Sequence, residues 1–324
     1  MRNDKITNED IHNPHDKLFK AAFMVKETVT EFIINFFPKE LLELIDLKKL
    51  KLDTNNYIAE DLKEYFADVV YSTKLNGRNS TLVLLFEHKT TISKALFLQL
   101  LGYMYFIWKK DFQEKRPFSI IIPIVVYQNK RKYFRKSWYH LFPNLPEELK
   151  PYIPNFDFIL TQVKNIGDVT IFDLKDEGLL KTVLLAFKHI ENTDFVIKHF
   201  DDFFKFFQNN PHLEVFSRQL LIYLYRRSGI NLDIIRELVN QLPQSLKSEA
   251  MTTYAQIKEE GKIEGKIEGE AIGVGKGIEK KNIQVIESGY LNGVPIELLS
   301  KITETSIEYV KFIIQKMNND DYPT

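Results

Sequence analysis

The chain has 324 residues, 44% of them hydrophobic and 13% aromatic, with 44 basic and 44 acidic side chains and no cysteine. The missing cysteines exclude disulfides, thiolate zinc sites and cysteine nucleophiles, and they fit a reducing compartment. The balanced charge means that any nucleic-acid surface has to be local. Because the N-terminus lacks the apolar segment of a signal peptide and no apolar stretch reaches the roughly 18 residues of a membrane span, we expect a soluble, cytoplasmic protein.

The N-terminal region predicts one helix that starts at Asn13 and Pro14 and ends before Pro38. Asn13 is expected as its N-cap and Pro14 as its first helical residue. A short helix is expected to follow through Leu44. The apolar residues at helical spacing are Leu18, Phe19, Ala22, Phe23, Val29, Phe32, Ile33 and Phe36.

Strand patterns follow, and a helical pattern over residues 93–108 interrupts them. They cover residues 47–52 weakly, and then residues 65–73, 81–87, 118–127 and 156–163. Asn76 and Gly77 give a strong hairpin signal between the second and third patterns. The apolar run over 118–127 predicts a strand buried on both faces. The order helix, hairpin, helix, strand indicates a small α/β core with a mixed sheet flanked by helices.

The C-terminal half is expected to be all-helical, with helical patterns from Asp176 to Asn240. A Glu/Gly/Lys repeat over 259–281 then carries glycines at 261, 265, 269, 273 and 277. Each glycine costs a helix about 1 kcal/mol relative to alanine. The repeat is therefore either a flexible linker or a close-packing helix that pairs two copies of the chain into a homodimer.

Four segments follow from these patterns. We expect a core over 1–165, a helical extension over 166–258, the repeat over 259–281 as helix or linker, and a small helical unit over 282–324. The last unit is expected as a two-helix hairpin around Thr303 to Thr305. Because Lys311 and Lys316 are the only basic residues of its second helix, an interaction module is favoured over a DNA-reading helix pair.

The strand pattern over 81–87 runs into three polar residues, Glu87, His88 and Lys89. Strand side chains alternate, so Glu87 and Lys89 point one way and His88 the other. An unpaired buried charge is expensive. Either this strand end is solvated, with Glu87 salt-bridged to Lys89, or the charges serve a function.

The residues around this strand end suit phosphodiester hydrolysis, which needs a polarised phosphate, an activated water and relief of negative charge. Mg²⁺ prefers oxygen ligands, usually one or two carboxylates. Asp68, on the paired strand, and Glu87 are the candidate ligands, with the backbone carbonyl of His88 as a third. Lys89 is the candidate to orient the water or stabilise the phosphate, and Gln99 is the candidate to hold the water or a phosphate oxygen.

Two further residues near this set have alternative roles. Asp16 is either an additional metal ligand or an acid in the first turn of a helix, near the positive end of its dipole. Tyr103 shares one helix face with Gln99, because the two are four residues apart, and it is expected to pack rather than react.

The arrangement of Asp68, eighteen intervening residues and Glu87-His88-Lys89 resembles the PD-(D/E)XK nuclease superfamily. The fuller string is similar to the recombination-promoting nuclease / putative transposase family within it. The segments that carry this resemblance are HDKLFK (15–20), ADVVYS (67–72), LLFEHKT (84–90), IPIVVY (122–127) and the Glu-Gly tail. Ala67 replaces the proline of the superfamily name, and Gln128-Asn129 replace a glycine that is frequent in the family.

The resemblance implies a restriction-endonuclease-like core and a Mg²⁺-dependent DNA endonuclease, with Mn²⁺ as the alternative ion, associated with recombination or mobile elements. The alternative is a catalytically silent DNA-binding or protein-interaction module that keeps the nuclease fold. The sequence has no G-x-S-x-G, no phosphate-binding loop and only scattered histidines, which argues against serine hydrolases, nucleotide-binding enzymes and zinc enzymes.

A basic run with interleaved aromatic residues, NKRKYFRKSWYH, covers residues 129–140. Its cations could neutralise DNA phosphates and its aromatic rings could stack on bases. Equally, it could be a solvated loop whose aromatic residues enter the core. The candidate DNA contacts are Lys130, Arg131, Lys132, Arg135 and Lys136.

Overall fold

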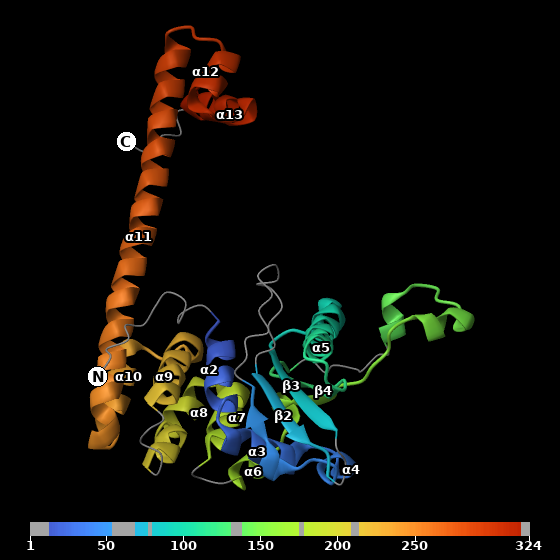
Figure 1. Cartoon of the computed structure of the whole chain (residues 1–324). Helices are drawn as coiled ribbons and strands as arrows, with labels where there is room; N and C mark the ends of the chain where they lie inside the picture. Colours follow the sequence, from blue (N-terminus) through green and yellow to red (C-terminus); the bar gives the residue numbers. More distant parts are fainter. Residues whose placement is uncertain are drawn as a thin grey trace. The chain divides into compact units, whose positions relative to one another are not determined.

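The computed structural model describes residues 13–53, 69–76, 80–130, 138–174, 178–208 and 214–318 (Figure 1). Its contacts divide the chain into two compact units, residues 1–256 and 257–324. The first unit is a mixed sheet surrounded by helices, which confirms the expected α/β class, and the second unit is helical.

The sheet has five strands in the order β1-β2-β3-β4-β5. They are β1 (Lys51–Leu52), β2 (Val69–Lys74), β3 (Thr81–Lys89), β4 (Ile120–Tyr127) and β5 (Ile159–Gln162). The first three strands form an antiparallel meander, whereas β4 runs parallel to β3 and β5 parallel to β4. The carboxyl ends of β3, β4 and β5 therefore lie at the same edge of the sheet.

Strand β3 is buried on both faces, and its alternating side chains enter two different cores. Leu84 and Phe86 pack into the large core with helices α2 (Pro14–Phe23), α3 (Lys26–Phe36) and α7 (Leu179–His189). Val83 and Leu85 pack on the other face against helix α5 (Ala95–Gln113). Figure 1 shows α5 on one side of the sheet and α2, α3 and α7 on the other. The alternation at the end of β3 decides which face each polar residue reaches.

The single N-terminal helix predicted from sequence is wrong, because the chain breaks at Met24 and Val25 into α2 and α3. The break lets Phe23 and Phe32 both pack on Phe86, with ring centroids 5.6 and 5.9 Å away. Asn13 does not cap α2 with its side chain. It adopts a left-handed conformation with φ of 58° instead, while Pro14 starts the helix as predicted.

The first unit contains further helices. They are α4 (Lys39–Leu42), α6 (Asp168–Phe172), α8 (Thr193–Lys198), α9 (Glu214–Ser228), α10 (Leu232–Gln241) and the start of α11 (Gln244–Leu291). Short 3-10 segments cover Leu47–Lys49, Trp138–Leu141, Glu147–Tyr152, Val163–Asn165 and Asp201–Gln208. Leu184 and Phe187 of α7 share one core with Phe86 and Ile124 of the sheet. The helices after residue 165 therefore complete the core of the sheet.

The second unit contains the end of α11, α12 (Ile296–Thr303) and α13 (Ile307–Asn318). Leu299, Val310 and Ile313 pack against Ile286 of α11. The hairpin predicted around Thr303 to Thr305 is confirmed, since α12 and α13 meet there. A side chain at Gly289 would place its Cβ 2.4 Å from Leu299 Cδ2, so this position admits only glycine without a shift.

The Glu/Gly/Lys repeat is helical, as part of α11, and not a flexible linker. A Cβ added at Gly261, Gly265, Gly269, Gly273 or Gly277 would meet nothing within 4 Å. The pairing of two copies through this segment stays a prediction. None of the helices in the described ranges combines the length and apolarity needed to cross a bilayer.

Candidate functional site

Glu87 lies at the carboxyl end of β3, only 2% exposed, on the face that α5 covers. Its Oε1 lies 2.7 Å from the Lys89 ammonium and accepts a hydrogen bond of 2.8 Å from Gln99 Nε2. Lys89 remains 23% exposed. The salt bridge with Lys89 expected for a solvated strand end is therefore confirmed, but the solvent exposure expected for Glu87 is wrong, because its carboxylate is buried.

Gln99 comes from the first turns of α5 and uses its amide group twice. Besides Glu87, Gln99 Nε2 donates to the hydroxyl of Tyr103, 2.5 Å away and one helical turn further on. Tyr103 is buried among the side chains between α5 and the sheet. The packing role predicted for Tyr103 is confirmed, and its hydroxyl also fixes the amide that holds Glu87.

His88 points to the opposite face of the sheet, as strand alternation predicts. Its Nδ1 lies 3.0 Å from Asp16 Oδ1 and its Nε2 lies 3.2 Å from Gln128 Oε1. The ring lies between Phe19 and Phe187, with centroids 5.4 and 4.8 Å away. An oxygen atom of a neighbouring side chain thus lies within hydrogen-bond distance of each ring nitrogen. His88 is thus fixed by polar and aromatic contacts together.

Asp16 and its neighbour His15 bring the first turn of α2 to this strand end. Burial raises the pKa of Asp16, but the hydrogen bond with His88 and the nearby positive charges together outweigh burial, so the pKa lies below its ordinary value. Burial, and then the nearby His88, lower the pKa of His15 to about 4. At neutral pH His15 is therefore uncharged and Asp16 is a carboxylate.

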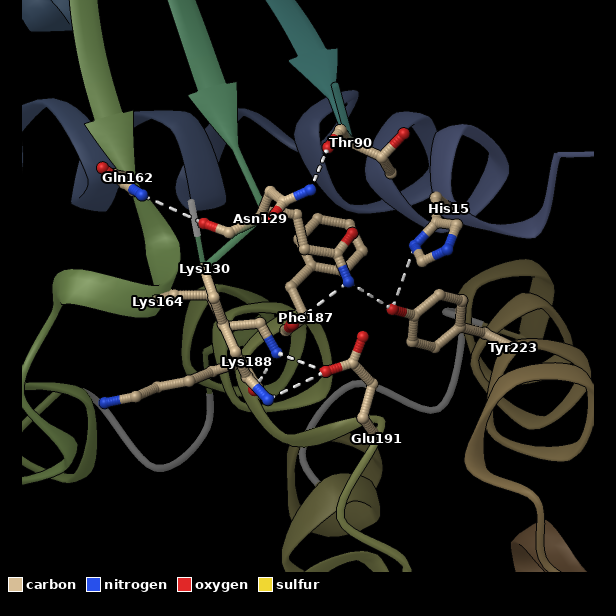
Figure 2. Close-up of polar contacts among 11 residues, drawn as sticks. His15, Thr90, Asn129, Lys130, Gln162, Lys164, Phe187, Lys188, Glu191 and Tyr223 are labelled. Atoms are coloured by element: carbon tan, nitrogen blue, oxygen red, sulfur yellow. Dashed lines mark hydrogen bonds and ion pairs between the residues drawn. The ribbon is translucent and has the colours of Figure 1, made fainter. Parts of the chain in front are cut away.

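The contacts of His88 continue through Gln128, the first residue after β4. Gln128 Nε2 donates to the Phe187 carbonyl at 3.0 Å and to the Tyr223 hydroxyl at 2.8 Å. Tyr223 Oη in turn lies 3.1 Å from His15 Nδ1 (Figure 2). This His88 network, made of His15, Asp16, His88, Gln128 and Tyr223, joins α2, β3, α7 and α9 at one edge of the sheet.

Sequence patterns gave no signal for two members of the His88 network. In the sequence, Gln128 stood out only as one of two residues that replace a glycine frequent in the family. Tyr223 lies in a helix without any chemical motif. The hydrogen bond between them spans 95 residues of sequence. No local spacing encodes such a contact.

Among the predicted site residues, the structure brings together Glu87, Lys89 and Gln99, whereas Asp16 contacts His88. Asp68 lies outside the described residues. The next residue, Val69, pairs with Phe86, directly before Glu87.

Of the predicted DNA contacts, Lys130 is described, and its Nζ lies 3.1 Å from Glu191. Arg131, Lys132, Arg135 and Lys136 lie outside the described residues. Trp138, at the end of the same run, is buried with Phe97 and Phe158. At Trp138 the interpretation as a core residue is therefore correct.

The oxygen atoms at this strand end suit a hard cation. Glu87 offers a carboxylate and His88 a main-chain carbonyl, and Mg²⁺ prefers oxygen donors. Within the ranges that the structure describes, no group of three or more His, Asp or Glu side chains is placed to hold a metal ion. A metal site here therefore requires a further ligand, for which Asp68 is the predicted residue.

Comparisons with known proteins place the chain in a family. It is 27% identical over 193 residues to “Recombination-promoting nuclease RpnD” of Escherichia coli O157:H7, covering 58% of this chain and 72% of that protein. It is 29% identical over 189 residues to “Recombination-promoting nuclease RpnC” of Escherichia coli K12, covering 57% and 61%. It is 23% identical over 197 residues to “Inactive recombination-promoting nuclease-like protein RpnE” of the same strain, covering 59% and 63%.

The chain thus spans about three fifths to three quarters of the length of these relatives. No solved structure matches it. Residues 13–215, more than half of the chain, match the family described as “Putative transposase, YhgA-like”. The matched segment contains the Glu87, Lys89 and Gln99 cluster, and the chain belongs to this family.

Proposed function

We propose that this protein is a metal-dependent DNA endonuclease of the PD-(D/E)XK type, with a restriction-endonuclease-like core, associated with recombination or mobile elements. The observation that carries the proposal is the buried Glu87 carboxylate, which binds the Lys89 ammonium and the Gln99 amide at the end of β3. The relatives named as recombination-promoting nucleases support it.

In this proposal Asp68, Glu87 and the His88 carbonyl hold Mg²⁺ or Mn²⁺. When bound, such an ion polarises the scissile phosphate and lowers the pKa of a water molecule. Lys89, the partly exposed cation beside Glu87, orients the attacking water or offsets the negative charge that develops on the phosphate. Gln99 holds the Glu87 carboxylate and is a positioning residue. Asp16 is assigned to His88, which it contacts, and not to the metal.

Plasmid nicking by the purified chain tests the proposal, with Mg²⁺ or Mn²⁺ against EDTA. Glu87→Gln removes the charge and keeps the shape, and we expect cleavage to fall by at least about 100-fold. Glu114→Gln is the matched control, since Glu114 is a half-exposed glutamate paired with Arg116 at the end of α5. Cleavage by Glu87→Gln at the wild-type rate would contradict the proposal.

A second function deserves the same test because RpnE, a relative at 23% identity, is named inactive. In that alternative the chain is a catalytically silent module that binds DNA or another protein. A folded wild-type protein that binds duplex DNA and leaves it intact with both metals would support the alternative and exclude the nuclease.

A further inference from the structure

One exposed carboxylate, Glu191, lies between cations at the carboxyl ends of β4 and β5. Lys130 follows β4, and its Nζ lies 3.1 Å from Glu191 Oε2. Lys164 follows β5, and its Nζ lies 3.8 Å from the same oxygen. Figure 2 shows both lysines converging on Glu191. Arg227, at the end of α9, adds a third positive charge that lowers the pKa of this carboxyl, after the effects of Lys130 and Lys164.

The three side chains differ sharply in exposure. Those of Glu191 and Lys130 are 65% and 74% exposed, whereas that of Lys164 is only 9% exposed. Lys164 also donates to the Lys188 carbonyl, and Lys188 is itself paired with Asp168 at 2.6 Å. Within the described part of the chain, Glu191 is thus the one carboxylate paired with Lys164, at a distance beyond hydrogen-bond length. A nearly buried ammonium with so distant a counter-charge is poorly compensated.

Hydrogen bonds join the chain segments next to Lys130 and Lys164 to the end of β3. Asn129 Nδ2 donates to the Thr90 carbonyl at 3.1 Å, and Gln162 Nε2 donates to the Asn129 carbonyl at 3.0 Å (Figure 2). The backbone N–H of Gln128 also donates to the Lys89 carbonyl at 2.9 Å. The residues that follow β3, β4 and β5 are therefore tied together. Such preorganisation lowers the entropic cost of binding a ligand across them.

We propose that Glu191 occupies the position of a DNA backbone phosphate, and that duplex DNA displaces it from Lys130 and Lys164 when another phosphate of the same duplex reaches Glu87 and Lys89. This inference rests on the proposed nuclease function. Carboxylate and phosphate oxygens are equivalent acceptors for an ammonium group. Two cations, Lys130 and Lys164, face the one Glu191 carboxylate, so positive charge is left over for the ligand. Glu191 then weakens DNA binding, because each encounter must break its ion pairs.

Fluorescence anisotropy with a labelled duplex in EDTA measures binding without cleavage. Glu191→Gln is expected to tighten binding about threefold to tenfold at about 100 mM salt, since one competing ion pair is removed. Glu114→Gln is the matched control. It makes the same charge change at an ion-paired glutamate that precedes β4, at the opposite end of that strand, and it is expected to leave the affinity unchanged.

Lys130→Ala removes an exposed cation with little risk to folding. It is expected to weaken binding and to reduce the slope of log affinity against log salt by about 1. In the Lys130→Ala background, the gain from Glu191→Gln is expected to shrink, because fewer cations are released for the phosphate.

Equal affinities for Glu191→Gln and Glu114→Gln would overturn the phosphate site and leave the nuclease proposal standing. A wild-type protein that neither binds nor cuts DNA would remove the nuclease proposal itself. Inorganic phosphate, followed by ³¹P line broadening, is the second probe. Tighter phosphate binding by Glu191→Gln with unchanged duplex affinity would assign the site to a free anion, and so overturn the assignment to DNA.

Discussion

The two faces of the end of β3 hold their polar residues in different ways. On the face toward α5, Glu87 binds Lys89 and Gln99, and Lys89 still reaches solvent. On the face toward α2 and α7, the side chain of His88 is fully buried and lies between Asp16 and Gln128. Adjacent residues of one strand thus enter a charged cluster whose cation is partly exposed and a network in which His88 is buried while Asp16 reaches solvent.

This difference suggests separate roles for the two faces: reaction with a ligand at Glu87 and Lys89, and support of the strand end at His88. A fully satisfied buried network stabilises one arrangement of the elements around it, whereas a partly satisfied one is costly. Within the His88 network, His88 has a partner at each ring nitrogen, whereas His15 Nε2 is buried without one among the residues that the structure describes. His88 itself can therefore fix the strand end from behind, and Lys89 on the other face stays partly exposed to a ligand. Substitutions on the two faces should affect different measurements.

The largest expected effect falls on the face toward α5. Lys89→Met should reduce metal-dependent nicking by about 100-fold or more, because the charge that offsets the phosphate is lost. The same variant should still fold but with a lowered thermal midpoint, because it removes the cation partner of the buried Glu87 carboxylate. Calorimetry and nicking on one preparation check both parts. A Lys89→Met protein that unfolds would show that this face is structural.

The next effect falls on the other face. His88→Ala leaves Asp16 and Gln128 facing a cavity and should lower the free energy of unfolding by about 3 kcal/mol. Urea denaturation measures this loss. Gln99→Ala, on the α5 face, is the comparison variant. It should reduce cleavage and should lower the free energy of unfolding by less than His88→Ala does. Similar stability losses for the two variants would remove the distinction between the faces.

A pair of hydroxyl deletions sharpens the comparison further. Tyr223→Phe should cost about 1–2 kcal/mol of stability, because the hydroxyl between Gln128 and His15 disappears. Tyr103→Phe removes the same atom beside Gln99, and we expect a loss of cleavage of about threefold to tenfold through misplacement of Gln99. In denaturation Tyr223→Phe should be the more affected variant, whereas in nicking Tyr103→Phe should be the more affected one. Identical rankings would contradict the division of roles.

The smallest effect concerns Asp168, which supports α7 through Lys188 and His189. Its hydrogen bond with Lys188 lowers its pKa below 3.8. The stabilisation is therefore present above pH 3.8 and disappears as the pH falls through the lower folded value. Asp168→Asn should cost less than about 1 kcal/mol at neutral pH, since the carboxylate is half exposed. Denaturation of both proteins across the acid range should show this difference vanish.

Local patterns predicted the sheet and the α5 face well. The apolar runs gave β3 and β4, strand alternation put Glu87 and Lys89 on one side, and a helix start at the right distance brought Gln99 to them. These contacts join residues close in sequence, for which periodicity is informative.

Long-range packing accounts for what the sequence did not predict. The break between α2 and α3 lets Phe23 and Phe32 both pack on Phe86. The helical spacing of these residues in the sequence does not reveal this contact. Gln128 and Tyr223 meet only after α9 packs beside α2. Asp68 and its metal stay predictions, since Asp68 lies outside the described residues.

The contact between Gln128 and Tyr223 sets the size of the unit that can be moved between proteins. A fragment cut after β5 would keep Glu87, Lys89 and Gln99 and would lose both the Phe187 carbonyl and the Tyr223 hydroxyl that hold Gln128. Even the segment matched to the family ends at residue 215, before Tyr223. A shortened or transplanted version of this chain should therefore keep the whole segment from α2 through α9.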